Sequence, residues 1–87
     1  MKSDHQIVGI HIDDRLQEAV EVQKVLTEFG KYIKTRLGLH DLESGDAPNG
    51  LLLVEMVAEA DTVADFANKL TAIHGVEAQT MTFSHPA

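Results

Sequence analysis

Apolar and polar residues change their spacing several times along the chain, and each change marks a predicted element. Residues 6–12 are rich in β-branched side chains, and residues 31–40 and 76–83 alternate, so all three segments predict strands. Residues 51–58 are apolar almost without a break, which is typical of a strand buried on both faces. Residues 41–50 are turn-formers and predict a surface loop.

Two stretches show helical spacing instead. In residues 15–29 the apolar positions predict a helix with a broad buried face, made of Leu16, Ala19, Val20, Val22, Leu26 and Phe29. A narrower stripe follows the third strand and consists of Val63, Phe66, Ala67, Leu70 and Ile73. Helix-capping residues and glycines are expected at the ends of both helices, because they satisfy free backbone groups there.

The first helix is expected to be capped by Asp13 and Asp14 and to end at Gly30 in a left-handed conformation. The second is expected to be capped by Asp61 and Thr62 and to be closed by Gly75.

The order strand–helix–strand–strand–helix–strand predicts an α+β, ferredoxin-like fold. Its sheet has four antiparallel strands in the order 4-1-3-2, with both helices on one face. The first and third strands are then central, and they are also the most apolar. The second strand lies at an edge, where Lys34 and Arg36 discourage unwanted pairing. Residues 1–87 are expected to form one domain, with 1–5 and 84–87 as flexible termini.

Strand alternation also predicts which side chains face away from the helices. In the first strand Val8, Ile10 and Ile12 face the helices, which leaves Ile7, Gly9 and His11 on the other side. Glu55 belongs on that other side as well, because a carboxylate buried under the helices would be costly to desolvate. The face away from the helices then carries an apolar patch that predicts an oligomer interface, composed of Ile7, Leu51, Leu53 and Val57.

Charge and composition exclude several classes of function. The chain has seven Lys and Arg residues against fourteen Asp and Glu residues, a net charge of −7, which argues against a nucleic-acid partner. It has no cysteine, so disulfides and thiolate chemistry are excluded. Neither a signal peptide nor a membrane-spanning run is present, so we expect a cytoplasmic protein without membrane association.

The sharpest pair of chemistry-bearing residues is His11 and Asp13, because imidazole and carboxylate both bind divalent metals. One such pair is weak evidence for a metal, and a helix cap at Asp13 with His11 on the sheet surface explains both residues. The two adjacent aspartates are explained in the same way, as helix-start residues rather than paired catalytic carboxylates. We therefore predict no catalytic residue, no metal and no cofactor.

Three segments resemble a known family. They are Ile10 to Arg15 opening the first helix, Arg36-Leu-Gly38 in the second strand, and Lys69 to Val76 leading toward Thr80. The chain resembles the small regulators of the iron-only hydrogenase system, which are similar to ACT-type ligand-binding domains and to the C-terminal domain of the nickel-responsive repressor. The resemblance implies a regulatory subunit that forms dimers or larger oligomers through its sheets.

Two departures from the related domains limit what carries over. The Asp-x-Pro-Gly turn of amino-acid-binding ACT domains is replaced here by residues 13–16, which contain neither proline nor glycine. The nickel repressor's site uses clustered histidines and a cysteine, and this chain has no cysteine and no His-x-His pair. Neither ligand set is therefore transferred to this sequence.

The leading interpretation is an oligomeric regulatory or sensor domain. A small-molecule effector would bind between subunits near the first strand–helix turn, at Gly9, His11, Asp13, Asp14 and Arg15. One alternative is a small enzyme of the ferredoxin-like barrel type, with His11 as general base in a cavity between the sheet and the helices. Another is a protein-interaction module that binds no ligand.

Overall fold

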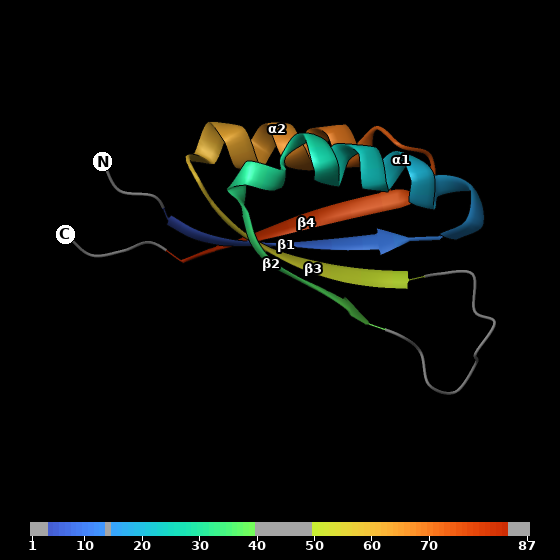
Figure 1. The fold of residues 1–87 in the computed structure, drawn as a ribbon, viewed down its shortest axis with the longest axis horizontal. Helices are drawn as coiled ribbons and strands as arrows, with labels where there is room; N and C mark the ends of the chain where they lie inside the picture. The colour runs from blue at the N-terminus through green and yellow to red at the C-terminus, as the bar shows by residue number, and fades with distance from the viewer. Residues whose placement is uncertain (1–3, 14, 40–49, 84–87) are drawn as a thin grey trace.

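The sheet has the predicted topology. A computed structural model describes residues 4–13, 15–39 and 50–83. In these residues the strands are β1 (Asp4–Ile12), β2 (Ile33–Leu39), β3 (Gly50–Ala58) and β4 (Val76–Phe83). The helices are α1 (Arg15–Glu28), the short 3-10 helix η1 (Gly30–Tyr32) and α2 (Ala60–Thr71). All pairings are antiparallel in the order β2-β3-β1-β4, and Figure 1 shows both long helices over one face of the sheet.

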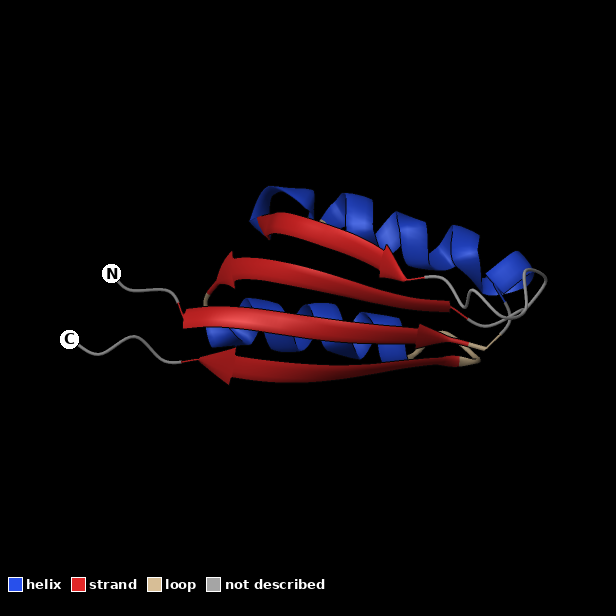
Figure 2. Cartoon of the chain, turned by 90° about the horizontal axis from the view of Figure 1, so that it is seen from below, coloured by secondary structure: helices blue, strands red, loops and turns tan. Residues whose placement is uncertain are grey.

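The register confirms the predicted two faces. Ile7 pairs with Glu55 of β3 and with Met81 of β4, while Val8 pairs with Val54 and Thr80. Paired residues point to the same side of a sheet, so each row across the strands belongs to one face. The helices cover one of the two faces. We call the opposite side the outer face, and Figure 2 shows it with the helices lying behind the strands. It is formed by His5, Ile7, Gly9, His11, Thr35, Leu37, Leu51, Leu53, Glu55, Val57, Glu77, Gln79, Met81 and Phe83.

The core lies between the sheet and the helices. Its fully buried side chains come from the two central strands and from α2, and they are Phe66, Ile10, Met56, Leu70, Val8, Val54 and Val63. Phe29, the residue that follows α1, meets Phe66 of α2 edge-on, with ring centroids 5.2 Å apart. Such aromatic contacts add to the burial of the rings, so this pair links the two helices.

Among the described residues, one polar side chain lies in the core. Gln6 is 3% exposed, and its Oε1 accepts a hydrogen bond of 2.9 Å from the Thr82 hydroxyl. Among the described residues its Nε2 has no hydrogen-bond partner.

At the surface, Lys69 of α2 donates a 2.6 Å hydrogen bond to Glu28 of α1. That bond raises the pKa of Lys69 above its ordinary value and joins the two helices at this end.

The first helix differs from its prediction in two respects. Val22, Leu26 and Phe29 are buried as expected, but Ala19 and Val20 are exposed, so the buried stripe is narrower than the run of apolar residues. Gly30 does not adopt a left-handed conformation; among the described residues only Gly75 has a positive φ, of 82°. Instead the chain continues from Phe29 into η1, which delays the start of β2 to Ile33.

The second helix begins earlier than predicted. Ala60 is its first residue and Glu59 occupies the cap position, so Asp61 and Thr62 lie in the first turn and do not cap it. Glu59 makes no side-chain capping bond, and its backbone carbonyl accepts from the Thr62 and Val63 amides at 3.0 and 3.1 Å. Asp61 remains favourable there, because an acid in the first turn interacts well with the helix dipole.

Other boundaries shift by a few residues. β1 begins at Asp4, two residues before the predicted start, and His5 lies within it. The predicted loop at residues 41–50 falls outside the described residues, apart from Gly50, the first residue of β3. The predicted cap at Asp14 also lies outside them.

Candidate functional site

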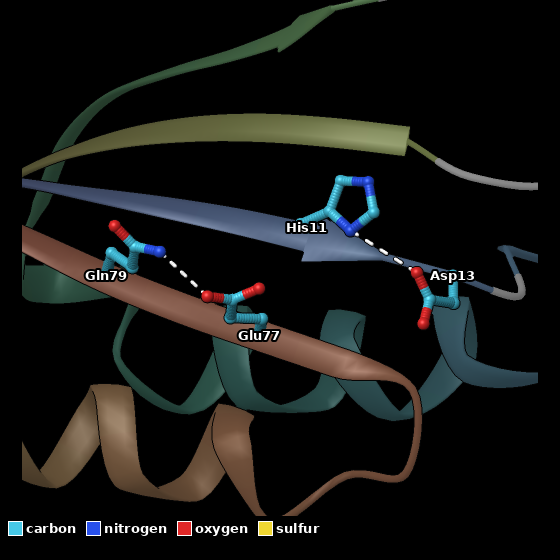
Figure 3. Close-up of polar contacts among 4 residues, drawn as sticks. All are labelled: His11, Asp13, Glu77 and Gln79. Atoms are coloured by element: carbon cyan, nitrogen blue, oxygen red, sulfur yellow. Dashed lines mark hydrogen bonds and ion pairs between the residues drawn. The ribbon is translucent and has the colours of Figure 1, made fainter.

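Three polar side chains of the outer face, those of His11, Glu77 and Gln79, lie near one end of the sheet, where β1 ends and β4 begins. The register sets Gly9 beside Gln79 and His11 beside Glu77. On the other side of β1, His11 pairs with Leu51 of β3. These five residues line a hollow of about 220 Å³, which we call the Gly9 hollow. Figure 3 shows how His11, Asp13, Glu77 and Gln79 stand relative to the strands.

Gly9 forms the floor of the hollow. A Cβ atom at this position would lie 3.7 Å from Leu53 Cδ2 and 4.0 Å from the Gln79 carbonyl oxygen, which are ordinary contacts. The backbone of the site would therefore accept an alanine, so the glycine is not required by packing. Because glycine has no side chain, it leaves space above β1 between apolar Leu51 and the polar residues Glu77 and Gln79.

The polar side of the hollow consists of His11, Glu77 and Gln79, and each of these side chains makes a polar contact. Gln79 Nε2 donates a 2.7 Å hydrogen bond to Glu77 Oε2. His11 Nδ1 lies 3.4 Å from Asp13 Oδ1, a separation that allows an ion pair when the imidazole is protonated. With Nδ1 protonated and turned toward the carboxylate, a neutral imidazole presents Nε2 as an acceptor. Glu77, Gln79 and His11 thus offer mainly acceptor atoms to whatever occupies the hollow.

Asp13 owes its position to a contact between distant parts of the chain. Its backbone amide donates a 2.8 Å hydrogen bond to the carbonyl of Gly75. Gly75 takes its positive φ in the turn that joins α2 to β4. The end of β1 is therefore attached to the start of β4, which keeps Asp13 and Glu77 at the same end of the sheet.

The apolar part of the outer face adjoins the hollow. Leu51 and Val57 of β3 are 40% and 42% exposed, and Leu37 of β2, Met81 and Phe83 of β4 are each more than half exposed. Ile7 and Leu53 are half-buried between these strands. No position placed on this face by the strand register is Lys or Arg; its charged or titratable residues are His5, His11, Glu55 and Glu77.

The structure brings together three of the five predicted ligand-site residues. Gly9 and His11 line the hollow and Asp13 contacts His11, whereas Asp14 and the side chain of Arg15 lie outside the described residues. Sequence reasoning missed Glu77 and Gln79. Their signal was available, because alternation in β4 combined with its place beside β1 puts both residues on the outer face.

The structure also bears on the alternatives for His11. It lies on the outer face, so it cannot act as a base in a cavity between sheet and helices, as the enzyme interpretation required. The described residues contain no group of three or more His, Cys, Asp or Glu side chains arranged to hold a metal ion. None of their helices is long and apolar enough to cross a membrane.

Together, the strand order and the helix-covered face define a ferredoxin-like α+β domain. The solved structure of an uncharacterized protein, TM1266 from Thermotoga maritima, is similar over 95% of this chain and 100% of its own, with a TM-score of 0.84 and 23% identity. No curated protein matches the sequence. The TM1266-like family model, described as "Iron-only hydrogenase system regulator, putative", matches residues 5–80. The chain belongs to this family, whose description names a regulator.

Proposed function

We propose that this protein is a regulatory module that self-associates through its outer face and binds a small ligand in the Gly9 hollow. The observation that carries the proposal is the composition of that face. Ile7, Leu51, Leu53 and Val57 form an apolar patch on the two central strands, on the face that the helices do not cover, and none of them is fully buried. Contiguous exposed apolar surface of this kind usually marks an interface.

A second copy is the occupant that the chemistry of this face favours. A two-fold contact counts each residue twice, and burying one leucine contributes about 1.5–3 kcal/mol. The carboxylates of the outer face have imidazoles for neighbours: His5 Nδ1 lies 3.9 Å from Glu55 Oε2, and the register sets His11 beside Glu77. A face with both kinds of group can meet a copy of itself without requiring lysine or arginine from elsewhere.

Leu53→Glu tests the interface. A carboxylate at the centre of the patch is expected to break the outer-face contact and lower the association state, or to give a protein that unfolds on dilution, because it would be desolvated at the contact. Sedimentation of wild type and variant at micromolar concentration measures this. The matched control is Val20→Glu, which places the same charge on an exposed apolar residue of α1 and should leave the association unchanged.

A compact wild-type monomer at micromolar concentration would overturn the interface. Equal loss of association in Leu53→Glu and Val20→Glu would overturn its assignment to the outer face. Leu51→Glu, at a more exposed position of the same strand, separates loss of association from loss of folding when circular dichroism is recorded on the same samples.

The lining of the hollow indicates the chemical class of the ligand. Glu77, Gln79 and His11 line the hollow together with the apolar side chain of Leu51, and no lysine or arginine lines it among the described residues. Such a site suits a small cation that donates several hydrogen bonds and carries an apolar body, such as an amidinium or guanidinium compound. A carboxylate ligand would be repelled by Glu77.

Benzamidine and benzoate are suitable probes, because they have similar size and opposite charge. In ¹⁵N-labelled protein, benzamidine is expected to shift the amide resonances of Gly9 and Gln79, and Glu77→Gln should weaken the effect about tenfold through loss of a charge-assisted bond. Benzoate should produce no such shift. Equal responses to both probes, or a response to benzamidine that Glu77→Gln leaves unchanged, would contradict this ligand class.

A further inference from the structure

The two edges of the sheet differ in how they are protected. β2 carries Lys34 and Arg36, and its pairing with β3 is irregular between Ile33 and Thr35. Arg36 also donates a hydrogen bond of 3.4 Å to the Gln23 side chain of α1, and Figure 2 shows α1 extending beyond this edge. Charge, irregular pairing and a covering helix are the devices that proteins use to prevent an edge strand from pairing with another chain.

β4 has none of these devices along most of its length. From Ala78 to Phe83 it contains neither a charged residue nor a proline, and its register with β1 is regular throughout. Gln79, Thr80 and Thr82 are exposed, and Met81 and Phe83 are 57% and 54% exposed. Threonine and phenylalanine favour strands. The edge therefore offers unpaired backbone groups along an uncharged strand, to which another strand can pair. In Figure 2 no described element lies outside it.

We propose that β4 pairs antiparallel with β4 of a second copy, joining two sheets into one continuous sheet of eight strands. Antiparallel pairing of one strand with itself is two-fold symmetric, so every position used by one copy is also supplied by the other. The net charge of −7 makes two copies repel each other over most of their surfaces. The uncharged part of β4 is a strip along which they can meet without bringing like charges together.

Symmetry restricts the register of this pair. A two-fold axis perpendicular to a continuous sheet keeps the helices of both copies on the same side of that sheet. Residues that pair across the axis must then point to the same face. This is possible only when one residue of β4 lies directly opposite the same residue of the second copy. An axis centred on Gln79 or on Thr80 pairs the same length of β4, residues 76–82 or 77–83, and we choose Thr80 because it keeps the two Glu77 carboxylates further apart. Gln79 then lies opposite Met81 of the partner subunit, and Glu77 opposite the partner's Phe83. The two Glu77 residues are separated by six residues along the strands, or about 20 Å, which keeps the carboxylates apart.

This contact is distinct from the outer-face contact proposed above, because it uses the backbone of an edge rather than the side chains of a face. The two are compatible in one assembly. Met81 and Phe83 project from β4 onto the outer face, so edge pairing would extend the apolar patch across the two-fold axis. A dimer formed through β4 would thereby present a larger surface for the face-to-face contact.

The absence of cysteine from the sequence makes disulfide trapping a clean test. Directly opposed residues in antiparallel strands have Cα atoms about 4.5–5.5 Å apart, within the range that a disulfide spans. Thr80→Cys should therefore give a covalent dimer on mild oxidation. Gln79→Cys and Met81→Cys should each give little alone, because their own copies would lie about 8 Å apart, but mixing these two variants should give the covalent heterodimer.

Gly38→Cys on β2 is the control for random collision, because Gly38 is exposed at that edge but belongs to a helix-facing row and not to the outer face. It should not form a comparable dimer. The Thr80→Cys dimer is also expected to persist when Leu53→Glu is added, which separates the edge contact from the face contact. No covalent dimer from any β4 cysteine would overturn the proposal, and so would equal yields at Gln79, Thr80, Met81 and Gly38. Covalent dimers confined to Gly38→Cys would assign the contact to β2 instead.

Discussion

At the scale of single residues, Gly75 connects the fold to the candidate site. Its φ of 82° lies in the left-handed region, which an L-amino acid with a side chain enters only at a cost. The same residue accepts the hydrogen bond from the Asp13 amide that joins the end of β1 to the start of β4. One backbone conformation therefore closes the α2–β4 turn and positions the carboxylate beside His11.

Gly75→Ala is expected to lower the free energy of unfolding by about 1–2 kcal/mol, the cost of a left-handed conformation for alanine. Chemical denaturation monitored by circular dichroism measures the change. Gly30→Ala is the matched control, since Gly30 has no positive φ and a Cβ there would meet no atom within 4 Å. Comparable destabilisation by both substitutions would show that the backbone conformation of Gly75 is not the cause.

At the scale of elements, strands were easier to predict than helix ends. Alternation in β1 and the position of Glu55 in β3 assigned both faces of the two central strands, because side-chain direction in a strand depends only on the count of residues. The buried face of α1 was overestimated at Ala19 and Val20. Apolar side chains at helical spacing indicate which residues are able to be buried, while the width of the contact depends on where the helix lies over the sheet.

The ends of the helices depend on features that residue type does not determine. Glu59 caps α2 only through its backbone, although Asp61 and Thr62 are better capping residues by type. Gly30 permits a left-handed cap, yet the chain continues into η1, where Tyr32 donates its amide to the Phe29 carbonyl at 2.9 Å. Phe29, which begins this turn, packs against Phe66 of α2. No local pattern in the sequence reveals that contact.

Only part of the candidate site was predicted, because the rest depends on contacts between distant segments. Gly9 and His11 were identified from their own strand, whereas Glu77 and Gln79 become neighbours only through the pairing of β1 with β4. That pairing joins segments that are far apart in the sequence. Predicting the hollow therefore required combining the strand order with the alternation of two separate strands, and not a motif within either.

At the scale of the whole molecule, charge opposes the proposed association. Each copy carries a net charge of −7, so two copies repel at low ionic strength, where the screening length is about 30 Å at 0.01 M salt and about 10 Å at 0.1 M. Raising the salt concentration across this range should tighten self-association, on the order of tenfold in Kd, or about 1.4 kcal/mol. Sedimentation equilibrium at several salt concentrations measures the change.

Weaker association at higher salt would show instead that local ion pairs across the contact, such as those between imidazoles and carboxylates, outweigh the repulsion of the two net charges. Leu53→Glu gives the reference for this experiment. This variant removes the outer-face contact and keeps the β4 edge, so any salt effect that remains in its sedimentation belongs to the edge contact or to shape and is measured separately.

The central position of β1 has a consequence for how the protein is made. β1 is synthesised before both strands that flank it, and its pairing with β4 joins His5 to Phe83. Ribosomes add about 5–20 residues per second, so the 71 residues from Ile12 to Phe83 take about 4–14 s to follow. During that interval Ile7, Val8 and Ile10 have no completed sheet to enter. The nascent chain therefore presents an apolar, strand-forming segment for seconds, the kind of segment that chaperones bind and that neighbouring polysomal chains can capture.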